Sequence, residues 1–319
     1  MARSTSIDFL TTSCKSSDII EDALRMIGVI EPGQTSGKGI DLLRAQRVLN
    51  QILKRDQQMG RNLLTLTRGH LFLTASQQSY TFGAATTHAT TTYVETAIAT
   101  AASETDLTIT VDDDDGISSG DEIGIELDDG TMQWTTVNGA PVANVITITD
   151  ALTDDAAVDS VVYTYTTELE TPVRIIPQGI MLDLSGGSEQ PVTLIARATY
   201  ENTTAKDTES KITQVYYDRQ YNSGVLYVWP TNDDPTDILH FTFERTIKDI
   251  DSHRNDMDIP VEAALYYTKM LASELALSFG LDLQKVAYIK QDAEMERTRF
   301  ESWNSEQGSI FMKPDFKYE

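Results

Sequence analysis

The feature that most constrains the fold is a long internal stretch without a single basic residue. No Lys or Arg occurs between Arg68 and Arg174. Residues 84–170 alone contain 18 Asp or Glu, so they supply −18 of the net charge of −24. A charge imbalance over so long a stretch is on the scale of a domain. Residues 84–170, the acidic segment, are therefore predicted to form a domain of their own.

The acidic segment has the pattern of an all-β domain. Apolar and polar residues alternate in short runs, and turns that contain Gly separate the runs. The clearest turn is Asp129-Gly130, which lies between two runs and predicts a hairpin. Such spacing favours a small antiparallel barrel or sandwich. The runs are 107–111, 123–127, 132–137, 145–149 and 161–165.

The sequence on both sides of the acidic segment predicts helices and a few strands. Residues 17–28 and 40–60 have apolar residues at helical spacing, and both ranges end at a Gly. Pro260 is a favourable first residue for a third helix, which Gly280 ends, and a fourth helix is predicted for 282–303. Shorter β patterns occur at 173–176, 192–198, 225–229 and 239–243.

The predicted fold class is therefore α+β, with a helical host domain that contains a small antiparallel sheet and is interrupted by an all-β barrel or sandwich. We expect the host to comprise residues 1–83 and 171–303, the insertion to comprise 84–170, and a C-terminal tail to follow at 304–319. If this organisation is correct, the strand ending at Gly83 and the strand beginning near Thr171 should lie close together.

Composition limits the partners of the chain. Its 49 acidic and 25 basic residues should keep it soluble and repel polyanions, so the molecule as a whole is expected to bind duplex DNA poorly. The single cysteine, Cys14, excludes an internal disulfide framework. The most apolar long stretch, 261–283, contains charged residues, so no membrane span and no membrane partner are expected.

No catalytic motif is recognised. A Gly-rich loop at 33–39 has three residues between its first two glycines and a Gly after Lys38, whereas a phosphate-binding loop needs four and a Ser or Thr. The four histidines have no metal-like spacing. No nucleophile, base and orienting group can be assembled. We therefore predict that the chain is not an enzyme and has no cofactor, catalytic residues or metal ligands.

The run Asp112–Asp115 nevertheless leaves a calcium site open as an alternative. In the register of an EF-hand loop Glu122 would be the last ligand, but Val111 would hold the first position and its side chain has no oxygen. A loop site of another type could add Asp128 or Asp154. The other alternative is a solvated acidic turn.

Two groups of residues are candidates for binding a partner. The polar face of the helix at 40–60 carries Arg44, Arg47, Lys54 and Arg55. These residues could meet an acidic surface, either of a partner or of the acidic segment of a neighbouring copy; the alternative is a solvated helix face. The polar C-terminal tail carries three aromatic residues that could dock into a partner or belong to a disordered end. They are Phe311, Phe316 and Tyr318.

Four segments also carry a family resemblance through their order and spacing. They are ALRMIG at 23–28 with EPG at 31–33 and LNQIL at 49–53; SYTFG at 79–83; GVLYVWPT at 224–231; and FERTIKDID at 243–251 with DIP at 258–260, which opens the helix that ends at Gly280. Together they resemble the head-to-tail adaptor, or tail accessory factor, family of short-tailed bacteriophages. Ala263 departs from the large aromatic residue usual there, and the acidic segment is not a feature of the minimal family member.

This resemblance implies a virion structural protein of the phage neck that is made in the host cytoplasm. It implies a homo-oligomeric ring, with a dodecamer as the expected state, that binds the portal protein and extends the DNA channel. Packaged DNA would pass through this channel without specific binding. The ring would also provide the attachment platform for the tail tube or nozzle protein. By the same resemblance, the helix at 282–303 and the aromatic tail would contact the portal.

Two other functions remain alternatives. The acidic segment could be a receptor- or glycan-binding module of the virion, in which exposed aromatic residues such as Tyr93 or Trp134 would bind the ligand. The chain could instead contain an acidic, calcium-stabilised enzyme domain. Ring formation together with portal would favour the adaptor over both alternatives.

Overall fold

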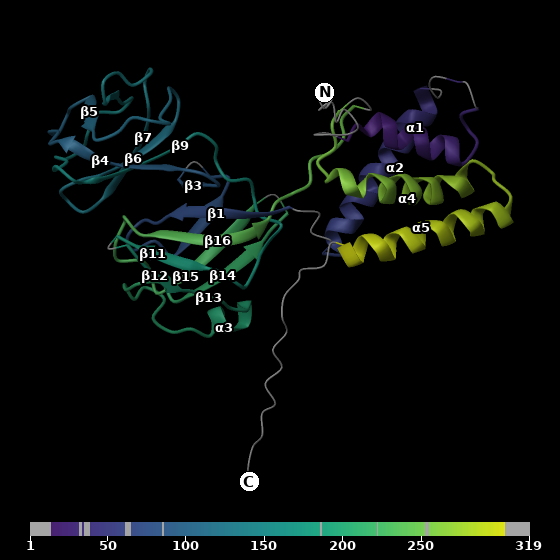
Figure 1. Ribbon diagram of the computed structural model, residues 1–319. Coiled ribbons are helices and arrows are strands. Elements are labelled where there is room, and N and C mark those ends of the chain that lie inside the picture. Colours follow the sequence, from purple (N-terminus) through teal and green to yellow (C-terminus); the bar gives the residue numbers. More distant parts are fainter. Residues whose placement is uncertain are drawn as a thin grey trace, which may run out of the picture. The chain divides into compact units, whose positions relative to one another are not determined.

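The chain divides into two compact units, a helical unit and a β unit. The computed structural model describes residues 14–31, 34, 39–60, 65–84, 86–185, 187–221, 223–252 and 255–303. The helical unit comprises both ends of the chain, Met1–Thr65 and Ile247–Glu319, and the β unit comprises Leu66–Thr246. Figure 1 shows the long helices at the two ends of the colour scale and the strands between them. The fold class α+β is thereby confirmed.

All four predicted helices are found in the helical unit. They are α1 (Ser16–Met26), α2 (Gly39–Gln58), α4 (Ala264–Ser278), which a short 3-10 turn (Val261–Ala263) precedes, and α5 (Leu283–Trp303). The chain leaves α1 and α4 through Gly28 and Gly280, whose φ angles of 77° and 74° suit glycine. In the described part of the chain, no helix is long and apolar enough to cross a membrane.

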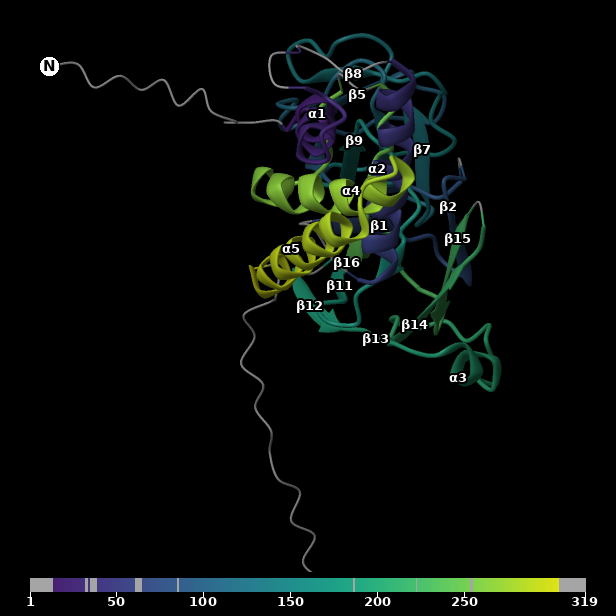
Figure 2. The same ribbon diagram turned by 90° about the vertical axis from the view of Figure 1, so that its right-hand side faces the viewer.

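Helix α4 is the centre of the helical unit and packs against α1, α2 and α5. Figure 2 shows α4 and α5 as neighbouring helices. Their contact includes the stacked rings of Tyr266 and Phe300, whose centroids lie 4.6 Å apart. The hydroxyl of Tyr266 donates to the buried carboxylate of Asp56 on α2 at 2.9 Å. Three helices therefore meet in one core.

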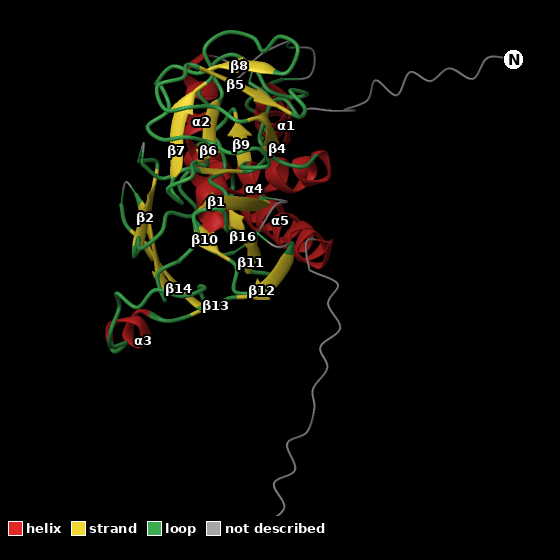
Figure 3. Ribbon diagram, turned by 90° about the vertical axis from the view of Figure 1, so that its left-hand side faces the viewer, coloured by secondary structure: helices red, strands yellow, loops and turns green. Residues whose placement is uncertain are grey.

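Two sheets form the part of the β unit outside the acidic segment, which adds the two residues Ala89–Thr90 to the first of them, and Figure 3 shows their strands in yellow. The first has the order β12-β11-β16-β1-β3, with β10 also paired to β16. The second has the order β13-β14-β15-β2, with the short helix α3 (Arg197–Glu201) after β13. The strands are β1 (Leu66–Phe72), β2 (Ser79–Phe82), β3 (Ala89–Thr90), β10 (Arg174–Ile175), β11 (Met181–Leu184), β12 (Ser188–Pro191), β13 (Thr193–Leu194), β14 (Gln214–Arg219), β15 (Gly224–Trp229) and β16 (Ile238–Glu244).

The third sheet lies wholly within the acidic segment and curls on itself. Its order is β7-β6-β9-β4-β5-β8, and a bridge between Val137 and Ile148 joins the ends of its two outer strands. The hairpin at Asp129-Gly130 is confirmed, because it joins β6 to β7 and Gly130 has a φ of 79°. This sheet, the barrel (residues 94–165), encloses its own apolar core. Its strands are β4 (Val94–Thr100), β5 (Thr108–Val111), β6 (Glu122–Glu126), β7 (Met132–Thr136), β8 (Val145–Thr147) and β9 (Val161–Tyr165).

An aromatic cluster joins the barrel to the first sheet. Phe72 of β1 and Ile238 of β16 pack in one cluster with Tyr163 and Tyr165 of β9. Trp134 borders the same cluster, and its ring would lie 2.8 Å from a Cβ at position 124, where the sequence has Gly. Tyr163 and Tyr165 therefore belong to strand β9 of the barrel and also pack against the first sheet.

The boundary between the two units differs from the predicted grouping. We expected residues 66–83 and 171–246 to belong with the helices, whereas they pack with the acidic segment. The physical reason is that β1 pairs along its whole length with β16, and both contribute to the aromatic cluster at the barrel. A Cβ on Gly83 would lie 3.9 Å from Thr171 Oγ1, so these two positions are close together, as expected.

Candidate functional site

A groove with basic side chains lies along α2 in the helical unit. It has a volume of about 620 Å³, and its charged lining residues are Arg47, Lys54, Arg55 and Asp249. The net charge of the lining is therefore +2. We call it the basic groove. Its remaining lining residues are Leu43, Gln46, Asn50, Gln51 and Gln58, so most of the lining side chains end in a polar or charged group.

One wall of the basic groove is a chain segment that is distant in sequence. Gln46 and Asn50 donate hydrogen bonds to the backbone oxygen of Ile250 at 2.7 and 3.1 Å, and Asn50 Oδ1 accepts one from its N–H at 3.0 Å. Lys54 Nζ donates to the oxygen of Ile247 at 2.7 Å and pairs with Asp249 at 2.9 Å. These contacts fasten residues 247–250 along α2 and fix the shape of the groove.

The other predicted basic residues lie in three environments. The guanidinium of Arg44 lies 5.6 Å from the centre of the Phe279 ring, so part of its charge faces an aromatic side chain. Arg55 pairs with Glu274 of α4 at 2.8 Å. Arg47 is exposed in the lining of the groove, and among the described residues no ion pair is found for it. Arg47 is therefore the lining cation best able to receive an external carboxylate.

A second groove, between the end of α1 and the start of α5, has more apolar residues in its lining. Its volume is about 610 Å³, and its lining includes Met26 and Tyr288, which are 43% and 74% exposed. Leu283, at the first position of α5, is also 74% exposed. This groove lies on the helix that the family resemblance assigns to portal contact. The three predicted docking aromatics of the tail, Phe311, Phe316 and Tyr318, lie outside the described residues.

The run of aspartates forms a tight acidic turn on the barrel. Asp113, Asp114 and Asp115 can each place a carboxylate oxygen within 4.8 Å of the others. Asp113 accepts the N–H of Asp115 at 3.0 Å, and Asp114 accepts the N–H of Asn144 at 3.1 Å. Val111 is fully buried in β5, and its side chain has no oxygen that could bind a metal ion. The carboxylates thus act as acceptors for the backbone of the turn.

Three histidines lie inside the β unit. Nδ1 of His70 and Nδ1 of His240 are 2.7 Å apart, and His240 Nε2 lies 3.4 Å from Asp183. His88 accepts or donates a 2.9 Å hydrogen bond with Tyr165 and stacks on Trp134 at 3.9 Å. Burial lowers the pKa of His88 to about 4, and burial together with the neighbouring His240 lowers the pKa of His70 to about 4. Both imidazoles are thus neutral at pH 7.

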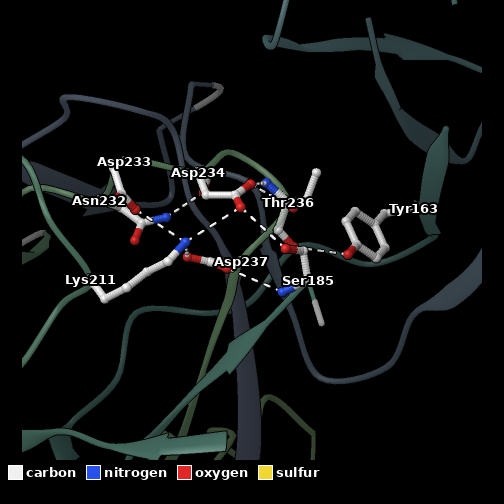
Figure 4. A network of polar contacts seen from close by, with 8 residues as sticks. All are labelled: Tyr163, Ser185, Lys211, Asn232, Asp233, Asp234, Thr236 and Asp237. Carbon is white, nitrogen blue, oxygen red and sulfur yellow. Dashed lines mark hydrogen bonds and ion pairs between the residues drawn. The ribbon is translucent and has the colours of Figure 1, made fainter. Parts of the chain in front are cut away.

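A partly buried ion-pair network stabilises the loop before β16 (Figure 4). Lys211 Nζ lies 2.8 Å from Asp237, which has no solvent exposure, and 3.1 Å from Asp233. Burial alone would lower the pKa of Lys211, but the hydrogen bonds to Asp237 and Asp233 raise it, so the lysine stays charged. Tyr163 of the barrel donates to the oxygen of Thr236 in the same loop at 2.9 Å. No sequence pattern pointed to this network.

The aromatic residues suggested for glycan binding are engaged within the β unit. Tyr93 makes edge contacts with His70 at 5.0 Å and with Phe72 at 5.5 Å. Trp134 stacks on His88 and contacts Phe72 at 5.1 Å. Their rings therefore contribute to the junction of barrel and sheet, and the basic groove is the best-defined candidate for binding a partner.

Neither the protein-family models nor the curated proteins gave a match to the chain. The candidate function therefore depends on the sites of the two units and on the resemblance in the sequence.

Proposed function

We propose that the chain is a virion structural protein, a ring-forming head-to-tail adaptor of the kind found in short-tailed bacteriophages. In this role it binds the portal protein, extends the DNA channel and provides the attachment platform for the tail. The order of the segments that resemble this family supports the proposal, and no catalytic constellation among the described residues competes with it. The ring would stand in the phage neck, with twelve copies as the expected number.

The observation that carries the proposal is the exposure of large apolar side chains on the helical unit. Each of its four long helices has at least one that is more than 40% exposed. Large apolar side chains exposed on every long helix of one unit are typical of a surface that another protein covers. These residues are Met26 of α1, Ile40 and Leu43 of α2, Leu265 and Leu277 of α4, and Leu283, Tyr288 and Met295 of α5.

The charge of the β unit fits a passage for DNA. This unit has 28 acidic and 7 basic residues, a net charge of −21. A channel wall must let DNA slide, so it should repel phosphate groups and make few ion pairs with them. Of the two units, the β unit is the one whose charge meets that requirement.

The test is assembly with a purified portal protein. Negative-stain images and mass photometry of the mixture should show a ring of this chain joined to the portal ring. Tyr288→Glu should weaken this joining about tenfold, because it places a charge on an apolar contact surface. Val142→Glu, a matched change at a 72% exposed residue of the barrel, should leave portal joining unchanged. A strictly monomeric chain that never joins the portal would refute the proposal.

A further inference from the structure

We infer that the basic groove on α2 is a docking surface between copies of this chain, and that its partner is the acidic barrel of a second copy. The inference deepens the proposed ring and rests on it, because it names the two surfaces that would meet around the ring. It does not concern portal contact, which the proposed function assigns to α5 and the tail.

The lining of the basic groove favours an acidic and polar partner. Leu43 is the only aliphatic residue among the described lining residues, and an apolar helix would leave the polar and charged ends of the other side chains without partners. The side chains of Lys54 and Arg55 are 38% and 37% exposed although both form ion pairs, and Arg47 is exposed as well. An arginine has five N–H donors in a planar fork, which suits a carboxylate better than any neutral group.

The barrel is the surface of this chain that best complements the groove. Residues 94–165 contain 16 acidic residues and no Lys or Arg, so no cation within the barrel balances them. The helical unit, in contrast, has 21 acidic and 18 basic residues, a charge of only −3. Carboxylates as close as those of Asp113, Asp114 and Asp115 repel one another and gain from an incoming cation. DNA is the other polyanion to consider, but a chain of net charge −24 repels it as it approaches.

The two surfaces also differ from each other, and that difference matters for the assembly. A contact between unlike patches of identical copies is heterologous, and repeated contacts of this type close into a ring when the rotation allows it. If the same surface of two copies met, the contact would instead give a two-fold dimer. A basic groove and an acidic barrel on every copy therefore supply the two ends that a head-to-tail ring needs.

A zero-length cross-linking experiment tests the contact directly. A carbodiimide joins a lysine to a carboxylate only when the two are paired, and the barrel has no lysine of its own. Equal amounts of unlabelled and ¹⁵N-labelled chain are mixed, cross-linked in low salt and digested at glutamate, since no tryptic site lies between Arg68 and Arg174. We expect peptides that join Lys54 to barrel carboxylates, half of them with one labelled and one unlabelled partner.

Charge variants provide the second measurement. Arg47→Glu should weaken self-association in sedimentation velocity about tenfold and remove the mixed-label cross-links, because it places like charges opposite each other. Lys285→Glu makes the same change on an exposed residue of α5 outside the basic groove and should leave both results unchanged. Raising the salt from about 50 to about 300 mM should weaken association of the wild type, since exposed ion pairs are screened.

The outcomes separate this inference from the proposed function. Rings that form equally well with Arg47→Glu, or cross-links in which both peptides always carry the same label, would overturn the docking of groove and barrel and leave the adaptor role standing. Binding of duplex DNA that Arg47→Glu removes would assign the groove to nucleic acid instead. A chain that never self-associates at any salt or concentration, with or without portal, would remove both proposals.

Discussion

The helical unit and the β unit handle charge in opposite ways, although one chain forms both. In the described part of the helical unit, many acids pair with a basic side chain; Lys269, for example, pairs with Asp292 at 3.1 Å and with Glu296 at 3.2 Å. In the barrel, acids instead accept backbone N–H groups at turns, as Asp121 does from Ser118 at 2.7 Å. The negative charge of the chain is thus a property of one unit, and each unit can be perturbed without the other.

The largest expected effect is in the core of the helical unit. Phe300→Ala removes the ring stacked on Tyr266 and leaves a cavity between α4 and α5, so it should lower the free energy of unfolding by about 4 kcal/mol. Urea unfolding followed by circular dichroism at 222 nm measures this loss. Tyr288→Ala, on the exposed side of the same helix, should cost less than about 1 kcal/mol. Equal losses in both variants would contradict this core.

The second effect concerns the ion-pair network of the β unit. Lys211→Met leaves the carboxylate of Asp237 buried without its cation, which should destabilise this unit by about 3 kcal/mol. Unfolding is followed by the fluorescence of Trp134 and Trp229, both in the β unit. Lys206→Met, at the other lysine of this unit, should cost less than about 1 kcal/mol. A loss of helix signal at the same urea concentration would show that the two units do not unfold separately.

A smaller effect is expected at the junction between the barrel and the first sheet. Tyr163→Phe removes the hydroxyl that donates to Thr236 and leaves a buried acceptor, at a cost of about 1.5 kcal/mol. Hydrogen exchange should then speed up in β9 and in the loop before β16, with the helices unaffected. Unchanged exchange in both segments would mean that this hydrogen bond does not hold the junction.

The smallest expected effect is a pH dependence confined to the β unit. Because the folded pKa of His88 is about 4, below the ordinary value of 6.5, the unfolded chain binds protons that the folded chain does not. This contribution to stability is complete above pH 6.5 and is lost as the pH falls from 6.5 to 4. His88→Phe keeps a ring against Trp134 without a titrating group, so the urea midpoint should fall less between pH 7 and pH 5 than in the wild type. An equal fall would contradict the assignment.

The sequence predicted those elements whose residues alternate clearly or repeat at helical spacing. The four long helices, the hairpin at Asp129-Gly130 and all five strand runs of the acidic segment were found in this way. Strand β12 was missed because Ser188–Pro191 is polar and mostly exposed, and so has no apolar face to detect. The run at 192–198 predicted one strand, whereas a two-residue strand is followed by α3, which begins at Arg197. Short elements take their structure from the surface they pack on.

The candidate site could be predicted only in part, for the same reason. Arg47 and Lys54 were found because a helix places them on one face. The wall that makes this face a groove comes from residues 247–250, about 200 positions further along the chain, and no local pattern reports it. Lys211 was missed because its carboxylates lie in a loop that only tertiary packing brings near. The sequence around a residue shows which face of a helix it lies on, but it does not show which distant segment closes a groove beside that face.

The closeness of Gly83 and Thr171 has a consequence for how such a chain can change. A domain that the chain enters and leaves at neighbouring points can be exchanged as one cassette without disturbing the path of the strands on either side. Another small domain with adjacent ends could be grafted between these positions, provided that it covers Phe72 and Ile238 as the barrel does. The inserted domain can therefore be replaced at this junction while the helices of the chain stay unchanged.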